Sequence, residues 1–112
     1  RSPISGTITG VNYKKGKFRL AFDHKASTEN EQNTLTIRQG QFELRCSQIA
    51  GLIARRIVCW KKSGDSVERG ERIGFIRFGS RVDLILPMDA VSVVQVGDKV
   101  YGGSSVIAKQ IK

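Results

Sequence analysis

Apolar and polar residues alternate along much of this chain with a period of two, the pattern of half-buried β-strands. The alternation is clearest over residues 73–78 and 82–86, which flank a Gly-Ser pair at Gly79 and Ser80. Other strands are predicted at residues 4–11, 18–22, 33–38 and 41–46, with Gln39 and Gly40 as a two-residue hairpin connection between the last two. Frequent glycines and few prolines favour many short strands joined by tight turns. The pattern therefore predicts an all-β fold.

A weak internal repeat sharpens the predicted architecture. The segment Gly64-Asp65-Ser66-Val67-Glu68-Arg69-Gly70 recurs 33 positions later as Gly97-Asp98-Lys99-Val100-Tyr101-Gly102-Gly103. Gly-Asp supplies a tight turn, Val a core anchor and the second Gly a return turn. Such paired units resemble the turns of biotinyl-lipoyl and sugar-permease IIA-like domains. We therefore expect a flattened barrel, or barrel-sandwich hybrid.

Two segments depart from the strand pattern. Residues 23–32 are polar and slightly acidic, which predicts a long loop or a mobile lid. Residues 49–58 are ambiguous, because 50–56 could form a short helix while the β-branched Ile57 and Val58 favour a strand.

The length of 112 residues suits one domain, and the net charge of +9 implies attraction to polyanions. Nucleic acid and an anionic membrane surface both fit, as does a merely soluble surface. The basic residues are dispersed, aromatics are sparse and no RNA-binding motif occurs, so nucleic acid is not expected. No run approaches the roughly 18 apolar residues of a membrane span. Because the chain opens Arg-Ser-Pro, we expect a fragment or a processed product.

Cysteine and histidine offer little chemistry. Cys46 and Cys59 lack CxxC spacing and lie in apolar runs, which favours reduced thiols over a disulfide or metal site and suits a cytosolic location. The lone histidine, His24, stands in the polar segment, where a solvated side chain competes with a proton-transfer role. No metal site is expected. Pro87-Met88-Asp89-Ala90 lacks the lysine that a lipoyl or biotinyl carrier would need.

The Gly-Ser pair has unusual surroundings for a turn, because alternating strand patterns flank it on both sides. The sequence around it, Ile76-Arg77-Phe78-Gly79-Ser80-Arg81-Val82-Asp83, resembles phosphatidylserine decarboxylase proenzymes of the short bacterial and archaeal form. The same resemblance extends over these stretches: residues 1–7, 29–35, 48–59, 64–65, 69–74 and 96–100. These stretches are spread from residue 1 to residue 100, so the resemblance spans essentially the whole chain, and it is to the carboxy-terminal part of the proenzyme.

The resemblance implies self-processing between Gly79 and Ser80, leaving residues 1–79 as a β chain and 80–112 as an α chain. The serine hydroxyl would attack the preceding carbonyl, and Ser80 would become a pyruvoyl group, so no external cofactor is needed. The pyruvoyl carbonyl would form a Schiff base with phosphatidylserine and accept electrons as CO2 leaves, giving phosphatidylethanolamine. Glycine at position 79 suits this role, because it leaves its carbonyl unobstructed and tolerates strained dihedrals.

In the family, a histidine and an aspartate that assist processing lie before the part corresponding to Arg1. His24 does not match that histidine, so an isolated chain of residues 1–112 is expected to stay intact and inactive. The expected partners are phosphatidylserine, an anionic membrane at its cytoplasmic face, the missing amino-terminal part, and a second copy in a homo-oligomer.

Four arginines are candidates for binding the phosphate or carboxylate of the substrate, since arginine offers paired donors. They are Arg55, Arg56, Arg77 and Arg81, with solvated strand faces as the competing interpretation. Phe78 is expected to pack in the core. The alternative function, from a different class, is a non-catalytic basic β-barrel that binds anionic lipid or nucleic acid.

Overall fold

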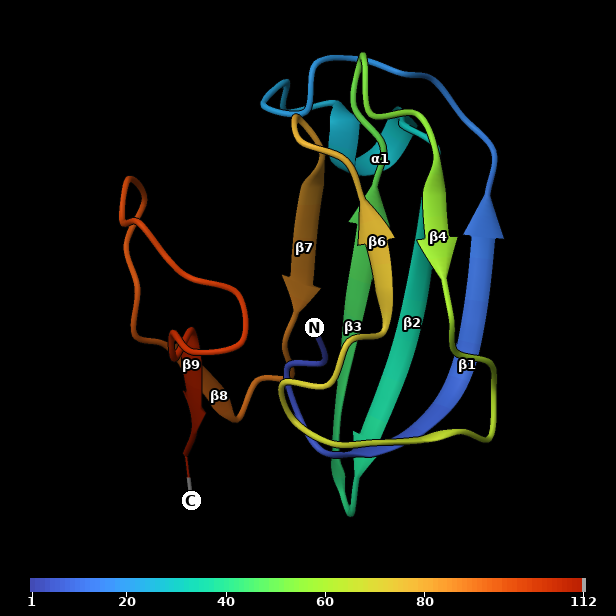
Figure 1. Ribbon diagram of the computed structural model, residues 1–112. Helices are drawn as coiled ribbons and strands as arrows, with labels where there is room; N and C mark the ends of the chain where they lie inside the picture. The colour runs from blue at the N-terminus through green and yellow to red at the C-terminus, as the bar shows by residue number, and fades with distance from the viewer. Residues whose placement is uncertain (112) are drawn as a thin grey trace.

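The computed structural model describes residues 1–111 and consists mostly of β-strands, as the alternating pattern predicts (Figure 1). In chain order the elements are β1 (Gly6–Lys14), α1 (Ala26–Glu29), β2 (Gln32–Gln39), β3 (Phe42–Ile49), β4 (Ile57–Cys59), β5 (Ser66–Val67), β6 (Gly74–Ile76), β7 (Arg81–Ile85), β8 (Ala90–Ser92) and β9 (Ala108–Gln110). Within the described residues they form a five-stranded sheet and two separate two-stranded ribbons.

The five-stranded sheet has the order β5-β1-β2-β3-β7, and all its neighbouring strands are antiparallel. Its centre is the β2–β3 hairpin, in which Leu35 pairs with Cys46. The predicted hairpin is confirmed, but its turn lies one residue later, because Gln39 already pairs with Phe42. Gly40 in this turn has a φ of +59°, a left-handed value that glycine adopts without steric penalty.

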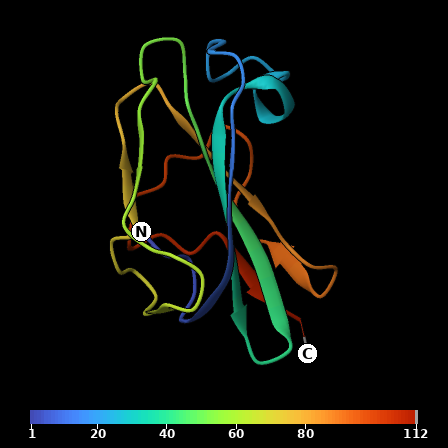
Figure 2. The ribbon, with the colours of Figure 1, turned by 90° about the vertical axis from the view of Figure 1, so that its right-hand side faces the viewer.

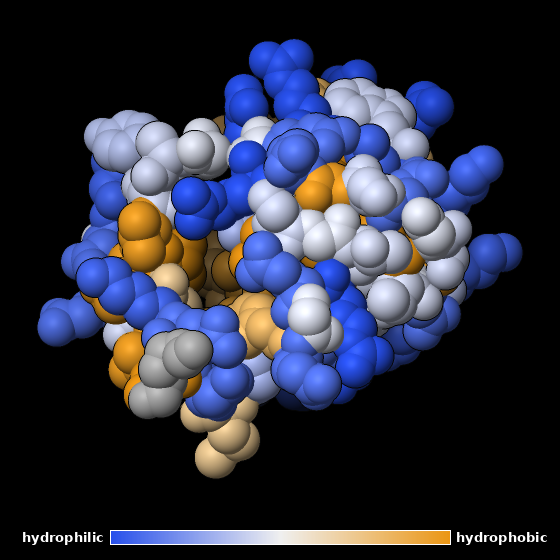
Figure 3. All heavy atoms as spheres, turned by 90° about the horizontal axis from the view of Figure 1, so that it is seen from below, coloured by the Kyte–Doolittle hydropathy of each residue, from blue (hydrophilic) through white to orange (hydrophobic). Residues whose placement is uncertain are grey.

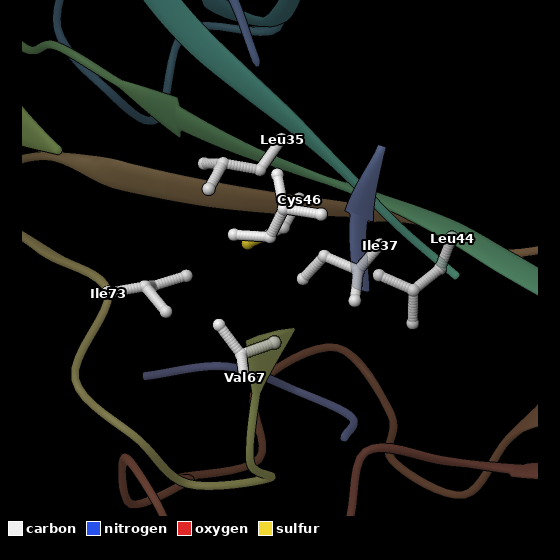
Figure 4. Close-up of a cluster of buried hydrophobic side chains, with 7 residues drawn as sticks. Leu35, Ile37, Leu44, Cys46, Val67 and Ile73 are labelled. Carbon is white, nitrogen blue, oxygen red and sulfur yellow. The ribbon is translucent and has the colours of Figure 1, made fainter. Parts of the chain in front are cut away.

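The hydrophobic core lies between strands β1, β2, β3 and β7 of this sheet and the segment of residues 57–76, which contains the edge strand β5 and covers one face of the sheet (Figures 2 and 4). In the sheet, Ile37 pairs with Ile8 of β1 on one side and with Leu44 of β3 on the other. The buried cluster comprises Ile8, Leu35, Ile37, Leu44, Cys46, Val67 and Ile73. Burying each Ile, Leu or Val side chain contributes about 1.5–3 kcal/mol to folding.

Buried amide side chains tie the β4–β6 ribbon to the sheet. Gln48 of β3 accepts a hydrogen bond from Asn33 Nδ2 at 3.0 Å and donates one from Nε2 to the Val58 carbonyl at 3.1 Å. Gly74 of β6 fits closely here, because a Cβ at this position would lie 2.5 Å from Gln48 Nε2. Polar groups buried in this way are stable only when their hydrogen bonds are satisfied. The network fixes β6, and with it the turn that leads into β7.

The internal repeat is confirmed in the backbone. Gly64 and Gly97 have φ values of +98° and +96°, and the closing glycines of the two copies have +86° and +83°. In each copy the aspartate side chain accepts a hydrogen bond from the backbone N–H three residues earlier, at 2.9 Å. The copies differ in packing, since Val67 is buried while Val100 is exposed.

The second copy belongs to the carboxyl-terminal segment of residues 86–111, whose β8–β9 ribbon lies beside the main sheet (Figure 1). Hydrophobic side chains are exposed along this segment: Met88, Val91, Val93, Val96, Val100, Tyr101, Val106 and Ile111. Seen from below, the molecule shows hydrophobic surface gathered on one side around a recess (Figure 3).

The connection between β1 and β2 differs from its prediction. Residues 18–22 form no strand, because Asn30 Oδ1 binds the Arg19 N–H and Leu20 O accepts the Asp23 N–H in a turn. Residues 23–32 contain the one-turn helix α1 in place of an open loop. The buried Asn30 donates from Nδ2 to the Ala50 carbonyl at 2.8 Å, which ties this connection to the end of β3.

Residues 49–58 resolve into the end of β3, a loop and β4, so the strand interpretation of Ile57 and Val58 is confirmed and no helix forms at 50–56. The sheet curls as an open half-barrel, while the more specific likeness to biotinyl-lipoyl domains stays a prediction. No helix within residues 1–111 has the length and apolar character to cross a membrane.

Candidate functional site

The Gly79-Ser80 bond lies in the exposed turn between β6 and β7, at the end of the sheet shown uppermost in Figure 1. Gly79 has a φ of +87°, a region in which a side chain would be strained. The Ser80 hydroxyl donates a hydrogen bond to the Arg77 carbonyl at 2.7 Å and closes the turn. The sequence thus places the Ser80 hydroxyl, a potential nucleophile, directly after the Gly79 peptide carbonyl. The backbone conformation at Gly79 is one that suits glycine.

An open pocket of about 540 Å³ adjoins this bond. The β1–α1 connection supplies one wall and the turn the other, through these residues: Leu20, Ala21, Phe22, Gly79, Ser80 and Arg81. Its lining is largely apolar except around Ser80 and Arg81. Such a pocket can take a ligand with both a polar and an apolar part.

A smaller hollow of about 190 Å³ lies on another side of Ser80, between β3, β6 and β7. Cys46 and Gln48 line it together with Val82. Burial raises the pKa of the Cys46 thiol to about 11, so this group is protonated at neutral pH and is a poor nucleophile. Ser80 therefore borders two cavities. In the smaller one, its hydroxyl is a better candidate nucleophile than the Cys46 thiol.

Arg81 is committed to the protein rather than free for a ligand. Its guanidinium pairs with Asp83, with Nε 2.6 Å from Oδ1, and donates from Nη1 to the carbonyls of Ala21 and Asp23 at 3.3 and 3.4 Å. These contacts hold the β1–α1 connection against β7. Arg81 also lines the open pocket, and its role in substrate binding stays a prediction.

The other candidate arginines are exposed. Arg55 donates from Nε to the Leu52 carbonyl at 2.8 Å and stacks over the Phe18 ring at 4.9 Å. Arg56 follows it in the same loop, and Arg77 opens the turn that contains Ser80. The loops that carry these residues lie at one end of the sheet (Figure 1), and the roles of the three arginines in binding stay predictions.

Phe78 does not pack in the core, contrary to expectation: its side chain is fully exposed, because the turn at Gly79 projects beyond both strands. His24 is solvated, with a side chain 91% exposed. Both cysteines are free thiols, as predicted. Within residues 1–111, no cluster of His, Cys, Asp or Glu has the arrangement of a metal site.

Gly51 is the residue at this site that the sequence interpretation missed. A Cβ built on Gly51 would lie 2.1 Å from the Gly79 carbonyl oxygen, so only glycine allows the two loops to approach this closely. An available signal was the isolated glycine in an apolar run, which often marks a close backbone approach.

A family model described as phosphatidylserine decarboxylase matches residues 1–108. A phosphatidylserine decarboxylase proenzyme from Chlorobium chlorochromatii is 49% identical over 109 residues, covering 97% of this chain and 51% of the relative. Proenzymes from Neisseria meningitidis serogroup C and Burkholderia multivorans are 53% and 50% identical, again over 97% of this chain but over 42% and 51% of their own lengths.

The chain thus spans about half the length of the curated relatives it matches. No solved structure gives a significant match. The match of nearly the whole chain, with Gly79 and Ser80 inside it, shows that the chain belongs to the phosphatidylserine decarboxylase family.

Proposed function

We propose that this chain carries the self-processing bond of a phosphatidylserine decarboxylase, and that Ser80 is the precursor of its prosthetic group. The observation that carries the proposal is the Gly79-Ser80 turn, which combines a left-handed glycine with a hydroxyl bordering an open pocket. Family membership supports the assignment of this turn to self-processing, because the relatives are named as proenzymes.

In the proposed reaction, Ser80 Oγ forms a bond to the Gly79 carbonyl carbon as the C–N bond to Ser80 breaks, which leaves an ester and a free amine. A base then removes the Ser80 Cα proton, the Cβ–Oγ bond breaks, and Gly79 leaves as a carboxylate. The elimination leaves a dehydroalanine at residue 80, and protonation of its Cβ converts this group into an imine. Water then replaces the imine nitrogen and releases ammonia, leaving a pyruvoyl group at position 80.

The surroundings of Ser80 fit such a group. Residue 80 borders the open pocket, while the next residue, Arg81, begins β7 and pairs with Ile49 of β3. A new terminus at residue 80 would thus be held at the pocket by the sheet. A pyruvoyl carbonyl supplies an electron sink for the loss of CO2 from an amino acid headgroup. No external cofactor is needed for this chemistry.

The proposed substrate is phosphatidylserine, which would be met at an anionic membrane surface on the cytoplasmic side. Apolar side chains on three loops around the pocket support this orientation: Phe22 is 84% exposed, Ile53 86% and Phe78 100%. Arg55 and Arg77 lie on the same loops and complement anionic lipid. Assembly with the remaining part of a proenzyme, and into a homo-oligomer, belongs to the same proposal.

Intact mass measurement of a proenzyme-length protein containing this segment tests the proposal. We expect two chains divided after Gly79. The mass of the fragment that begins at residue 80 should be lower, by one ammonia, than that of the same fragment beginning with an unmodified serine. Borohydride reduction in the presence of phosphatidylserine should attach the lipid at residue 80.

Ser80→Ala should abolish both the division and the lipid adduct, because it removes the nucleophile. The matched control is Ser92→Ala, since Ser92 is an exposed serine in the β8–β9 ribbon. An undivided wild-type protein that still binds lipid would instead favour the non-catalytic lipid-binding alternative.

A further inference from the structure

Gly51 lies against the carbonyl that the proposed reaction attacks. A methyl group on Gly51 would meet the Gly79 oxygen at 2.1 Å and the Gly79 carbonyl carbon at 3.1 Å. Heavy atoms cannot approach this closely, so any side chain at position 51 forces the Gly79 peptide or the 50–54 loop to move. Gly51 is itself buried, which leaves little room for such movement.

The position of Gly51 is fixed from both sides. Its N–H donates to the Ala54 carbonyl at 3.0 Å, which closes the 50–54 loop. The neighbouring Ala50 donates its N–H to the Glu31 carbonyl at 3.0 Å and accepts a hydrogen bond from the buried Asn30 side chain at 2.8 Å. The loop is therefore anchored to the α1 side of the molecule before it reaches Gly79.

We propose that Gly51 is a positioning residue for self-processing: because it lacks a side chain, it leaves the Gly79 carbonyl free to take the orientation that Ser80 Oγ attacks. The attack turns the planar carbonyl into a tetrahedral centre and concentrates negative charge on its oxygen. That oxygen then has to move within the space that Gly51 leaves by lacking a side chain. The inference rests on the proposed function, because it assigns Gly51 to that same bond.

The experiment compares Gly51→Ala with two other glycine variants in a proenzyme-length protein. Gly6→Ala creates a similar overlap, 2.3 Å from the Arg38 carbonyl oxygen, but between β1 and the end of β2, where neither residue belongs to the pocket or to the anchors of the 50–54 loop. Gly102→Ala adds a methyl group with no neighbour within 4 Å. The rate of chain division is measured by gel electrophoresis and intact mass, and the folded fraction by thermal denaturation.

We expect Gly51→Ala to slow division by about a hundredfold, the usual effect of displacing a reacting group by about 1 Å. Gly6→Ala should divide at nearly the wild-type rate once folded, and Gly102→Ala at the wild-type rate. Hydroxylamine cleaves esters, so it releases fragments from any protein that has stopped at the ester stage. We expect no such release from Gly51→Ala, because this variant should be blocked before the ester forms.

A folded Gly51→Ala protein that divides normally would overturn the inference, as would equal slowing by Gly6→Ala at the same melting temperature. If Gly51→Ala does not fold, Ala54→Gly loosens the same loop without adding an atom and should slow division several-fold. Normal division of that variant would also contradict the inference. Failure of the wild-type protein to divide would instead count against the proposed function.

Discussion

The Ser80 hydroxyl directs its proton to the Arg77 carbonyl at 2.7 Å. A base must take this proton before the oxygen becomes an effective nucleophile, because a neutral hydroxyl attacks amides slowly. In the proposed reaction, a base would therefore have to take the place of the Arg77 carbonyl as the partner of this proton.

Gly79→Ala is expected to destabilise the turn, because alanine at a φ of +87° costs about 1–2 kcal/mol. Measured in a Ser80→Ala background, where the chain cannot divide, the melting temperature should fall by several degrees. Gly102→Ala is the control, since a Cβ at that position meets no atom within 4 Å. Equal melting temperatures for the two variants would show that the turn relaxes without cost.

At the residue scale, the strand context and the family resemblance single out Gly79 and Ser80 in the sequence, and the cleavage assigned to them stays a prediction. The sequence could not predict the contacts of Arg81 with Ala21 and Asp23, because these partners are distant in sequence and use backbone carbonyls. Gly51 was missed for a related reason, because its significance depends on a carbonyl in another loop.

Among the elements, the β1–α1 connection shows how polar residues can order a segment that contains little regular structure. Arg19 binds Glu29, with Nη2 2.8 Å from Oε1, and this contact together with Lys17 lowers the pKa of the Glu29 carboxyl. The hydrogen bond from the Lys25 N–H lowers the pKa of the Asp23 carboxyl, and the positive charge of Arg19 lowers it further. These interactions hold one wall of the pocket in place.

Acidification should loosen this wall. Both carboxyl pKa values are lower in the folded chain than in the unfolded chain, so their stabilisation is complete above the ordinary values of 3.8 and 4.5. It is lost as the pH falls through the folded-state pKa values. Thermal denaturation at a series of pH values from about 6 to about 3 should therefore show falling stability.

Glu29→Gln should show a smaller loss of stability than the wild type over the same pH range, because its side chain no longer titrates. Glu43→Gln serves as the control, since Glu43 is an exposed carboxylate of β3 at the other end of the sheet. A pH dependence in Glu29→Gln identical to that of the wild type would contradict the proposed role of Glu29.

At the same scale, the sequence predicted the strands whose alternate residues face the core, such as β2, β3 and β7. It was wrong about residues 18–22, where Phe18 and Leu20 alternate with polar residues but no neighbouring strand is available. Alternation identifies a strand only when backbone groups find a partner, and here Asn30 binds the backbone instead.

For the molecule as a whole, the distribution of exposed apolar side chains sets the orientation proposed at a membrane. Ile53 and Phe22 project from the end that carries Ser80, while Val96 is exposed on the carboxyl-terminal segment. The all-β class could be predicted from sequence because it depends on local patterns. Whether the sheet closes into a barrel could not be predicted in this way, because closure depends on whether strand edges that are distant in sequence meet.

Ile53→Ser should weaken binding to vesicles containing phosphatidylserine by about tenfold or more, because burying an isoleucine in lipid contributes about 1.5–3 kcal/mol. Val96→Ser is the matched control and should leave binding unchanged. Cosedimentation with vesicles measures both effects, and added salt should weaken the remaining charge-dependent part. Equal losses for the two variants would exclude the proposed orientation, and unaltered binding by Ile53→Ser would do the same.

Strand β7 begins one residue after Ser80 and pairs with β3 from Arg81 to Ile85. A break at residue 79 would therefore sever the covalent chain without removing any of this pairing. The two products would remain one particle, joined by a shared sheet, and would separate only under conditions that unfold the sheet. The new terminus would gain rotational freedom on one side alone, so that the proposed self-processing would convert an internal turn into a tethered end beside the pocket.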